Sequence, residues 1–247
     1  MSKIEEYRTV LEEITNWDDF LLENSGLPGR RANIELARAA ALEGDRELFE
    51  RYLTYTPERA PTNSQYEFLP FCGVLGYGRL LSEDDLSLLP SLRRCANDPR
   101  WRIREAVAMA LQMLGRRDME RLIREMEDWS WGSLLEKRAA AAALCEPFLL
   151  GDERQAEKVL QILDEITSSL GDVEERKSEN IKALRKGLGY CWSVAVVANP
   201  GAGKPLMEKW MGSNDKDIVW IMKENLKKKR LARMDAEWVG DCKQMIL

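Results

Sequence analysis

Helical periodicity runs through almost the whole chain, and it restricts the fold more than any other feature of the sequence. Apolar residues recur at helical spacing in segment after segment, and no segment alternates convincingly between apolar and polar residues as a half-buried strand would. At 247 residues the chain is long enough to bury a substantial core. The sequence therefore predicts an all-α protein.

Capping residues mark where the first helices begin and end. Asn33–Leu42 is an alanine-rich helix that Gly44 ends, and Asp45 opens the next helix. The polar, proline-containing segment Pro57–Ser64 follows and is expected to be a loop. A helical hairpin before Pro57 is thereby separated from the rest of the chain.

Similar signals divide the remainder of the sequence. We expect Ser82 to cap a helix with acids in its first turn, and Asn97-Asp98-Pro99 to start a helix that runs to Gly115. Gly171–Lys177 is predicted to be a polar turn. The last two helices are predicted over Lys204–Met211 and Asp217–Met234.

Composition excludes several classes of chemistry. The chain has no histidine, so Ser-His-Asp and Cys-His catalysis and histidine-based zinc sites are excluded. The five cysteines are widely scattered and form no C-x-x-C pair, which favours reduced, buried thiols. The sequence predicts no metal and no cofactor, and the net charge of −5 does not suggest a nucleic-acid-binding protein overall.

Paired helices of this length resemble the HEAT and armadillo repeats of α-solenoid proteins. The segment Asp98–Gly115 carries the resemblance: an aspartate near the start, an apolar-arginine pair at Ile103-Arg104, small residues, then Leu-Gly. Leu134–Leu144 and Asp215–Leu226 follow the same pattern loosely. The resemblance implies an α-α superhelix of HEAT-like repeats, with residues 1–57 as an N-terminal helical cap and residues 64–247 as the main repeats.

A narrower resemblance is to the bacterial HEAT-like DNA alkylation-repair glycosylases. Trp101 and Glu105 have the spacing of that family's cleft tryptophan and aspartate, so they share one helix face. Arg138 matches the arginine on a later helix, and Tyr190 stands at the later aromatic position. The resemblance implies that Glu105 stabilises a sugar cation, that Trp101 and Tyr190 pack on a damaged nucleotide, and that Arg138 holds a phosphate.

The same residues have a plainer interpretation as structural or partner-binding groups. Trp101 can fill a seam between repeats, Glu105 and Arg138 can form an ion pair, and Tyr190 can belong to the core. If the repeats form a cleft that binds a partner, the sequence predicts that its contact residues are Trp101, Arg104, Glu105, Arg138, Tyr190 and Trp192.

Two other motifs have residues that occur in anion-binding sites. The sequence Ala198–Pro205 looks like a phosphate loop, but Pro205 replaces the magnesium-binding Ser or Thr and no strand precedes the motif, so we expect a turn between two helices. The second motif is a basic edge near the C-terminus, which is interpreted either as a solvated helix end that complements the helix dipole or as a surface for phosphates. Its positive residues are Lys223, Lys227, Lys228, Lys229, Arg230 and Arg233.

The functional expectation has two forms. The first is a non-catalytic HEAT-like module whose concave surface holds a protein or peptide partner, either transiently or as a scaffold subunit. The alternative is a DNA-binding base glycosylase of the alkylation-repair type that uses Glu105 and the cleft aromatics. The start of the chain is charged and helical rather than a secretory signal, which favours a cytoplasmic protein, and the oligomeric state is left open.

Overall fold

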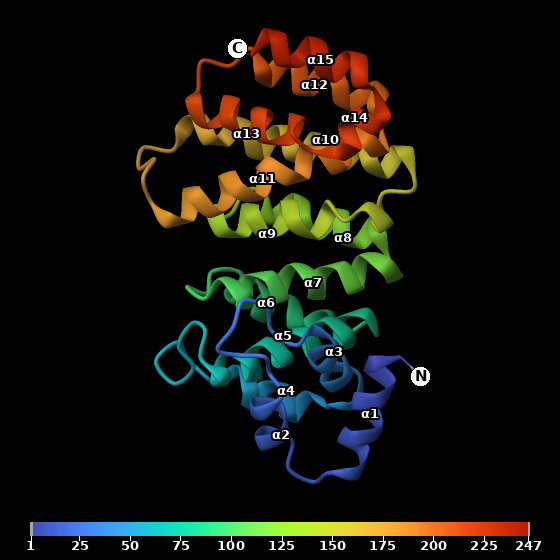
Figure 1. The fold of residues 1–247 in the computed structure, drawn as a ribbon, viewed down its shortest axis with the longest axis vertical. Coiled ribbons are helices and arrows are strands. Elements are labelled where there is room, and N and C mark those ends of the chain that lie inside the picture. Colours follow the sequence, from blue (N-terminus) through green and yellow to red (C-terminus); the bar gives the residue numbers. More distant parts are fainter. Residues whose placement is uncertain (1, 247) are drawn as a thin grey trace. The chain divides into compact units, whose positions relative to one another are not determined.

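The computed structural model describes residues 2–246, which form an all-helical fold (Figure 1). The described residues contain fifteen α-helices and four short 3₁₀ helices, and no strand. They pack as two compact units, unit 1 (Met1–Arg117) and unit 2 (Asp118–Leu247). The predicted all-α class is therefore confirmed.

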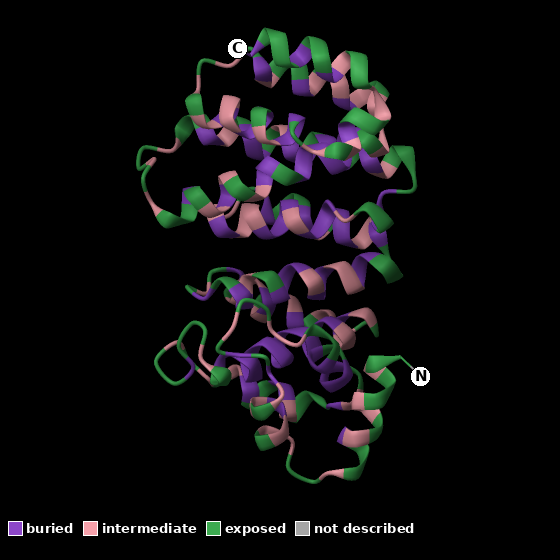
Figure 2. Ribbon diagram, in the orientation of Figure 1, coloured by how far each residue is buried: buried purple, intermediate pink, exposed green. Residues whose placement is uncertain are grey.

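Unit 1 is organised around one helix that is buried on nearly all sides. This helix is α5, whose sequence FLPFCGVLGYGRLLS is apolar all round, as a fully buried helix requires. Figure 2 shows it as a largely buried element between its neighbours. The odd-numbered helices form a row in which α1 packs on α3, α3 on α5 and α5 on α7, whereas α2 and α4 pack on α5 and α6 packs on α7. The helices are α1 (Lys3–Glu13), α2 (Trp17–Glu23), α3 (Ile34–Glu43), α4 (Arg46–Leu53), α5 (Phe68–Ser82), α6 (Leu89–Ala96) and α7 (Trp101–Arg117), with η1 (Gln65–Glu67) and η2 (Leu86–Leu88) between them.

A glycine lets α5 and α7 approach closely. A Cβ atom placed on Gly78 would lie 2.5 Å from the Cα of Ala110 and 2.7 Å from its Cβ. Real Cβ atoms do not come so near a backbone atom, so any larger residue would push the two helices apart. The α5–α7 spacing is consequently fixed by backbone contact.

Unit 2 is built from helical hairpins in two rows. In one row α8 packs on α10 and α10 on α12; in the other, α9 packs on α11 and α11 on α13. Each helix also contacts its sequence neighbour across the rows, which is consistent with a helical superhelix. The helices are α8 (Met119–Trp129), α9 (Leu134–Leu144), α10 (Glu153–Ser168), α11 (Glu179–Ala198), α12 (Pro200–Met211), α13 (Lys216–Leu226), α14 (Lys229–Met234) and α15 (Ala236–Met245), with η3 (Pro147–Leu149) and η4 (Ser169–Asp172).

A buried amide joins the two central helices of this unit. Asn225 of α13 is fully buried, and its Nδ2 donates to the carbonyl oxygens of Leu188 (2.9 Å) and Ile221 (2.8 Å). Its Oδ1 accepts from the backbone N–H of Ser193 at 2.8 Å. One side chain thus satisfies backbone groups on both α11 and its own helix.

Several predicted helix boundaries are correct and others are wrong. Gly44 ends α3 and Asp45 caps α4, as predicted, whereas Asn33 is not the first residue of α3 but its cap, accepting from the N–H of Leu36. Ser82 does not cap a helix; it is the last residue of α5, and its hydroxyl donates to the carbonyl of Arg79. The helix predicted from Asn97 begins only at Trp101, because Asp98 uses its carboxylate to accept from the N–H of Arg100 before the helix starts.

The helix predicted over Asp217–Met234 is broken into α13 and α14. Leu226 and Leu231 are both buried. In an uninterrupted helix these residues would point in directions about 140° apart, since each residue turns the helix by about 100°. The extended conformation of Lys228 between the two helices allows both leucines to reach the core.

The predicted turn at Ala198–Pro205 is shorter than expected. Asn199 caps α12, which begins at Pro200, so the two glycines of the motif and Pro205 lie inside this helix. Gly203 is required for packing, because a Cβ there would lie 2.8 Å from the Cα of Val196 in α11. Gly203 therefore serves close helix packing, and the motif forms the start of a helix and not a phosphate loop.

Candidate functional site

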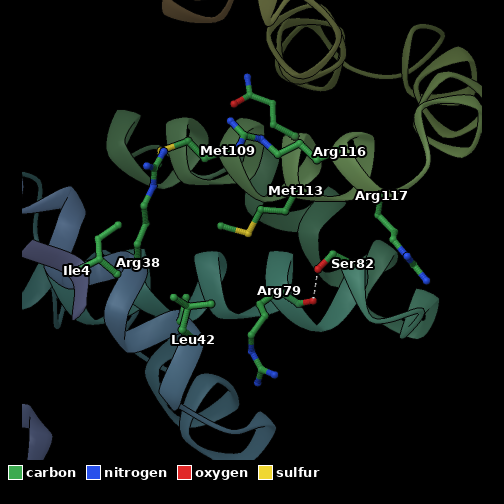
Figure 3. Close-up of a pocket in the computed structure, with 11 residues that line it drawn as sticks. Ile4, Arg38, Leu42, Arg79, Ser82, Met109, Met113, Arg116 and Arg117 are labelled. Atoms are coloured by element: carbon green, nitrogen blue, oxygen red, sulfur yellow. Dashed lines mark hydrogen bonds between the residues drawn. The ribbon is translucent and has the colours of Figure 1, made fainter. Parts of the chain in front are cut away.

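A pocket of about 480 Å³ opens in unit 1 among the odd-numbered helices α1, α3, α5 and α7 (Figure 3). This volume lies within the range of about 300–1,000 Å³ that is usual for ligand sites. We refer to it as the unit 1 pocket. Its lining residues come from helices that are far apart in the sequence but neighbours in the row.

The longest wall of the pocket is one face of α7. It presents two methionines with a glutamine between them, followed by two arginines, at the positions Met109, Gln112, Met113, Arg116 and Arg117. These positions are three or four residues apart or adjacent, so they form a single stripe along the helix. From the first to the last the stripe extends about 12 Å, at 1.5 Å per residue.

The remaining walls are contributed by three other helices. From α3 come Ala41, the 47% exposed Leu42, and Arg38, whose side chain reaches toward Met109 in Figure 3. Ile4 of α1 completes the apolar lining. The head group of Arg79 in α5 points away from the pocket in Figure 3, where it binds Glu83 and the carbonyl of Gly44.

The charge on this lining has one sign. Four of the lining residues are arginines, and no acidic side chain is among the eleven described lining residues. Among residues 2–246, neither Arg38 nor Arg117 has an ion-pair partner within unit 1. An apolar floor with positive groups at its margin suits an anionic ligand that also has an apolar part.

The predicted residues on α7 lie on the same side of the helix as the pocket stripe. Trp101 and Glu105 precede Met109 at intervals of four residues, so the stripe continues toward the start of the helix. Glu105 is exposed, and Trp101 is 45% exposed with the Arg102 guanidinium 4.4 Å from its ring centroid. Arg104 donates to the carbonyl oxygens of Asp98 and Pro99, and so closes the turn before α7.

The other predicted cleft residues belong to unit 2, where two of them are at least partly exposed. Arg138 of α9 is half-buried, with its Cγ 3.4 Å from where a Cβ on Gly187 of α11 would stand. Tyr190 of α11 is 42% exposed. Trp192 is fully buried and its indole N–H donates to Thr167 at 3.0 Å, so its prediction as a cleft residue is wrong: the ring belongs to the core.

The predicted basic edge lies beside Tyr190. The Arg230 guanidinium lies 4.5 Å from the tyrosine ring centroid and donates to its hydroxyl at 2.5 Å, and Lys228 Nζ lies 6.0 Å from the same centroid. Lys227 is paired with Glu224, whereas Lys223, Lys229 and Arg233 are exposed. The sequence did not predict this contact, since Tyr190 is separated from the basic edge by a whole helical hairpin.

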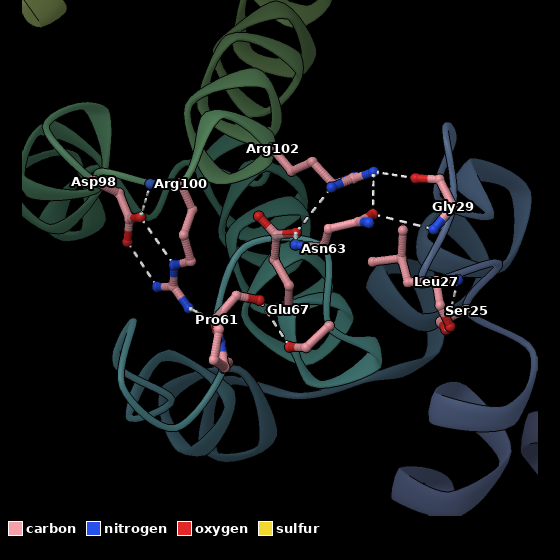
Figure 4. Close-up of polar contacts among 11 residues, drawn as sticks. Ser25, Leu27, Gly29, Pro61, Asn63, Glu67, Asp98, Arg100 and Arg102 are labelled. Atoms are coloured by element: carbon pink, nitrogen blue, oxygen red, sulfur yellow. Dashed lines mark hydrogen bonds and ion pairs between the residues drawn. The ribbon is translucent and has the colours of Figure 1, made fainter. Parts of the chain in front are cut away.

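A buried polar cluster holds the start of α7 (Figure 4). Arg102 is 4% exposed and pairs with the fully buried Glu67 at 3.0 Å. Its other nitrogen donates to the carbonyl of Gly29 at 2.6 Å and to the side chain of Asn63 at 3.1 Å. The cluster joins two loops to α7, and sequence reasoning missed it because Arg102 has the same local pattern as an exposed helical arginine.

A second buried arginine, two residues earlier in the chain, makes a similar set of bonds. Arg100, also 4% exposed, binds both carboxylate oxygens of Asp98 and donates to the carbonyl oxygens of Tyr55 and Ala60. These bonds fix the Pro57–Ser64 loop against the beginning of α7. The position of the α7 stripe is therefore determined by buried charges.

The cysteines are free, as the sequence predicted, and four of the five are buried. Burial raises the pKa of the Cys72 and Cys145 thiols well above the ordinary value, and it raises the pKa of Cys95 to about 11. A thiol acts as a nucleophile through its thiolate, so these three are poor nucleophiles near neutral pH. Within residues 2–246 no group of three or more cysteine or carboxylate residues is placed to hold a metal ion.

No protein-family model matches the chain, and no curated protein or solved structure matches it either. The HEAT-like and glycosylase resemblances therefore rest on the residues quoted above. Over the part of the chain that is described, no helix combines the length and apolarity needed to cross a membrane.

Proposed function

We propose that this chain is a HEAT-like helical-repeat module that binds a protein or peptide partner through the row of odd-numbered helices in unit 1. The observation that carries the proposal is the unit 1 pocket, with its methionine floor and arginine margin. Methionine is flexible and polarisable, so Met109 and Met113 suit a surface that adapts to a partner's apolar side chains. The row of odd-numbered helices in unit 1 and the two helix rows of unit 2 resemble the packing that repeat modules use to present an extended surface.

Placing a charge in the floor of the pocket is the direct test. A Met113→Glu substitution puts a carboxylate where the proposal requires an apolar contact, so peptides selected from a displayed library on the wild-type protein should lose at least about tenfold in affinity. Binding is measured by fluorescence anisotropy with labelled copies of the selected peptides. The matched control is Met245→Glu, which makes the same change at a 63% exposed methionine of α15.

Two results would contradict the proposal. If selected peptides bind Met113→Glu and wild type equally well, the partner does not use the unit 1 pocket. If hydrogen exchange of wild-type protein shows no protection of α3 and α7 when peptide is bound, the contact lies elsewhere. A loss of helicity in Met113→Glu, checked by circular dichroism, would require the milder Met113→Gln in its place.

A second candidate function is DNA binding of the alkylation-repair type. It is favoured by the exposed Tyr190 ring, which has Arg230 and Lys228 beside it. Aromatic rings flanked by cations are surfaces on which nucleic-acid bases stack. In this function Arg138, which is also in unit 2, would bind a phosphate, as the resemblance implies.

This candidate predicts salt-sensitive binding to duplex DNA that carries an abasic-site analogue. Tyr190→Ala should weaken that binding by roughly tenfold, since one base–aromatic stack contributes about 1–3 kcal/mol. Trp131→Ala, which removes a 76% exposed aromatic of unit 2 outside the basic edge, is the control. Absence of binding at micromolar protein and low salt would eliminate the candidate; binding would justify a base-excision assay with Glu105→Gln.

A further inference from the structure

We propose that the partner segment held by the unit 1 pocket is a short acidic amphipathic helix, with apolar side chains on one face and Asp or Glu beside them. This inference rests on the proposed function, because it names the chemistry of the partner for that same pocket. It follows from the charge of the lining, from the shape of its apolar floor, and from the places where the arginines stand.

Two of the four lining arginines, Arg38 and Arg117, supply the positive charge on which this inference rests. Two carboxylates on or next to the contributing helices have other partners: Glu43 of α3 pairs with Arg8, and Glu83 after α5 pairs with Arg79. Arg38 and Arg117 make no ion pair with any described residue of unit 1. A partner's carboxylates can therefore pair with these two arginines without first breaking an existing ion pair in unit 1.

The position of Arg38 is informative because helix stability does not account for it. Arg117 is in the last turn of α7, where a positive side chain is favoured by the helix dipole. Arg38 is in the middle of α3, where no such effect operates. Its side chain extends across the pocket toward Met109, from the opposite wall (Figure 3).

The shape of the apolar floor favours a helix over a compact small molecule. Met109 and Met113 are one turn apart on α7, and Leu42 faces them from α3. The α7 stripe is about two turns long, which is the length over which a docked helix places apolar residues at i, i+3, i+4 and i+7. A single amphipathic helix can therefore supply apolar contacts to the floor and carboxylates to both margins.

The experiment measures anisotropy of three labelled helix-forming peptides with leucine at i, i+3, i+4 and i+7. Their remaining positions are glutamate in the first peptide, glutamine in the second and lysine in the third. The expected result is that the glutamate peptide binds at least about tenfold more tightly than the glutamine peptide, that the lysine peptide does not bind, and that affinity falls as salt rises to about 0.15 M. The double variant Arg38→Glu/Arg117→Glu should reverse the preference toward the lysine peptide.

The matched control is Arg30→Glu, which reverses an exposed arginine of unit 1 outside the pocket and should leave the preference unchanged. Equal binding of the glutamate and glutamine peptides that is lost in Met113→Glu would overturn the acidic partner while retaining the peptide-binding module. Absence of binding by all three peptides would overturn the inference, and the proposed function would then depend on whether the displayed library yields a Met113-dependent binder. Tighter binding of dodecanoate than of any peptide, with competition between them, would overturn the helix in favour of a fatty-acid ligand.

Discussion

Replacing Arg102 with methionine is expected to lower the free energy of unfolding of unit 1 by about 3–5 kcal/mol, the usual cost of leaving a buried charge without its partner. Glu67 is fully buried, and among the described residues of unit 1 its cationic partner is Arg102 alone. The substitution also removes the donors to Gly29 and Asn63, which fix two loops to α7. Methionine keeps most of the aliphatic volume, so the loss is electrostatic more than steric.

The measurement is urea denaturation followed by hydrogen exchange of the α5 amides, which report unit 1 separately from unit 2. Arg30→Met makes the same chemical change at an exposed position and should alter stability by less than about 0.5 kcal/mol. Adding Glu67→Gln to the Arg102→Met protein should recover part of the loss, because the unpaired charge is then gone. A cost below about 1 kcal/mol for Arg102→Met would show that the cluster is not a determinant of stability.

The second large effect is expected in unit 2, where Asn225→Leu should lower the free energy of unfolding by about 2–4 kcal/mol. Leucine has a similar size and shape, so little packing is lost. What disappears is the acceptor for the Ser193 N–H and the donor to the Leu188 carbonyl, both within α11. Because the site is buried, water cannot replace the hydrogen bonds that Asn225 makes to these groups.

Hydrogen exchange of the α11 amides gives the readout for this variant. Asn180→Leu is the control, since it makes the same change at an exposed position near the start of α11. Asn225→Asp adds a diagnostic comparison: aspartate retains an acceptor for Ser193 but cannot donate to the two carbonyls. If Asn225→Leu and Asn180→Leu have equal effects, the buried amide contributes nothing specific to α11.

Local sequence signals were sufficient to predict a helix end where a single residue determines it. Gly44 and Asp45 act on neighbouring backbone groups through short-range hydrogen bonds, so their roles could be predicted from position alone. The break at Lys228 could not, because it depends on where Leu226 and Leu231 meet the core. The position of Ser82 is compatible with capping a following helix, but its hydroxyl donates to the carbonyl of Arg79 in the helix that ends at Ser82.

Only part of the candidate site could be predicted from the sequence. The face of α7 that carries Trp101 and Glu105 was identified from its spacing, and it is the face that continues into the unit 1 pocket. The pocket itself joins residues from α1 to α7, and no local pattern reveals that Arg38 and Met113 share one cavity. Trp192 was assigned to the cleft because an aromatic residue at helical spacing looks alike on either face; the bond to Thr167 places it in the core.

The contact between Gly78 and Ala110 has a consequence for how this surface can change in evolution or by design. The floor width between α5 and α7 is determined by two backbones in contact, not by the side chains that line the pocket. Arg38, Met109 and Met113 can therefore be exchanged for other residues while the frame that displays them keeps its dimensions. Libraries that vary only these lining positions should yield folded proteins with new ligand preferences, whereas variation at Gly78 would be expected to alter the frame itself.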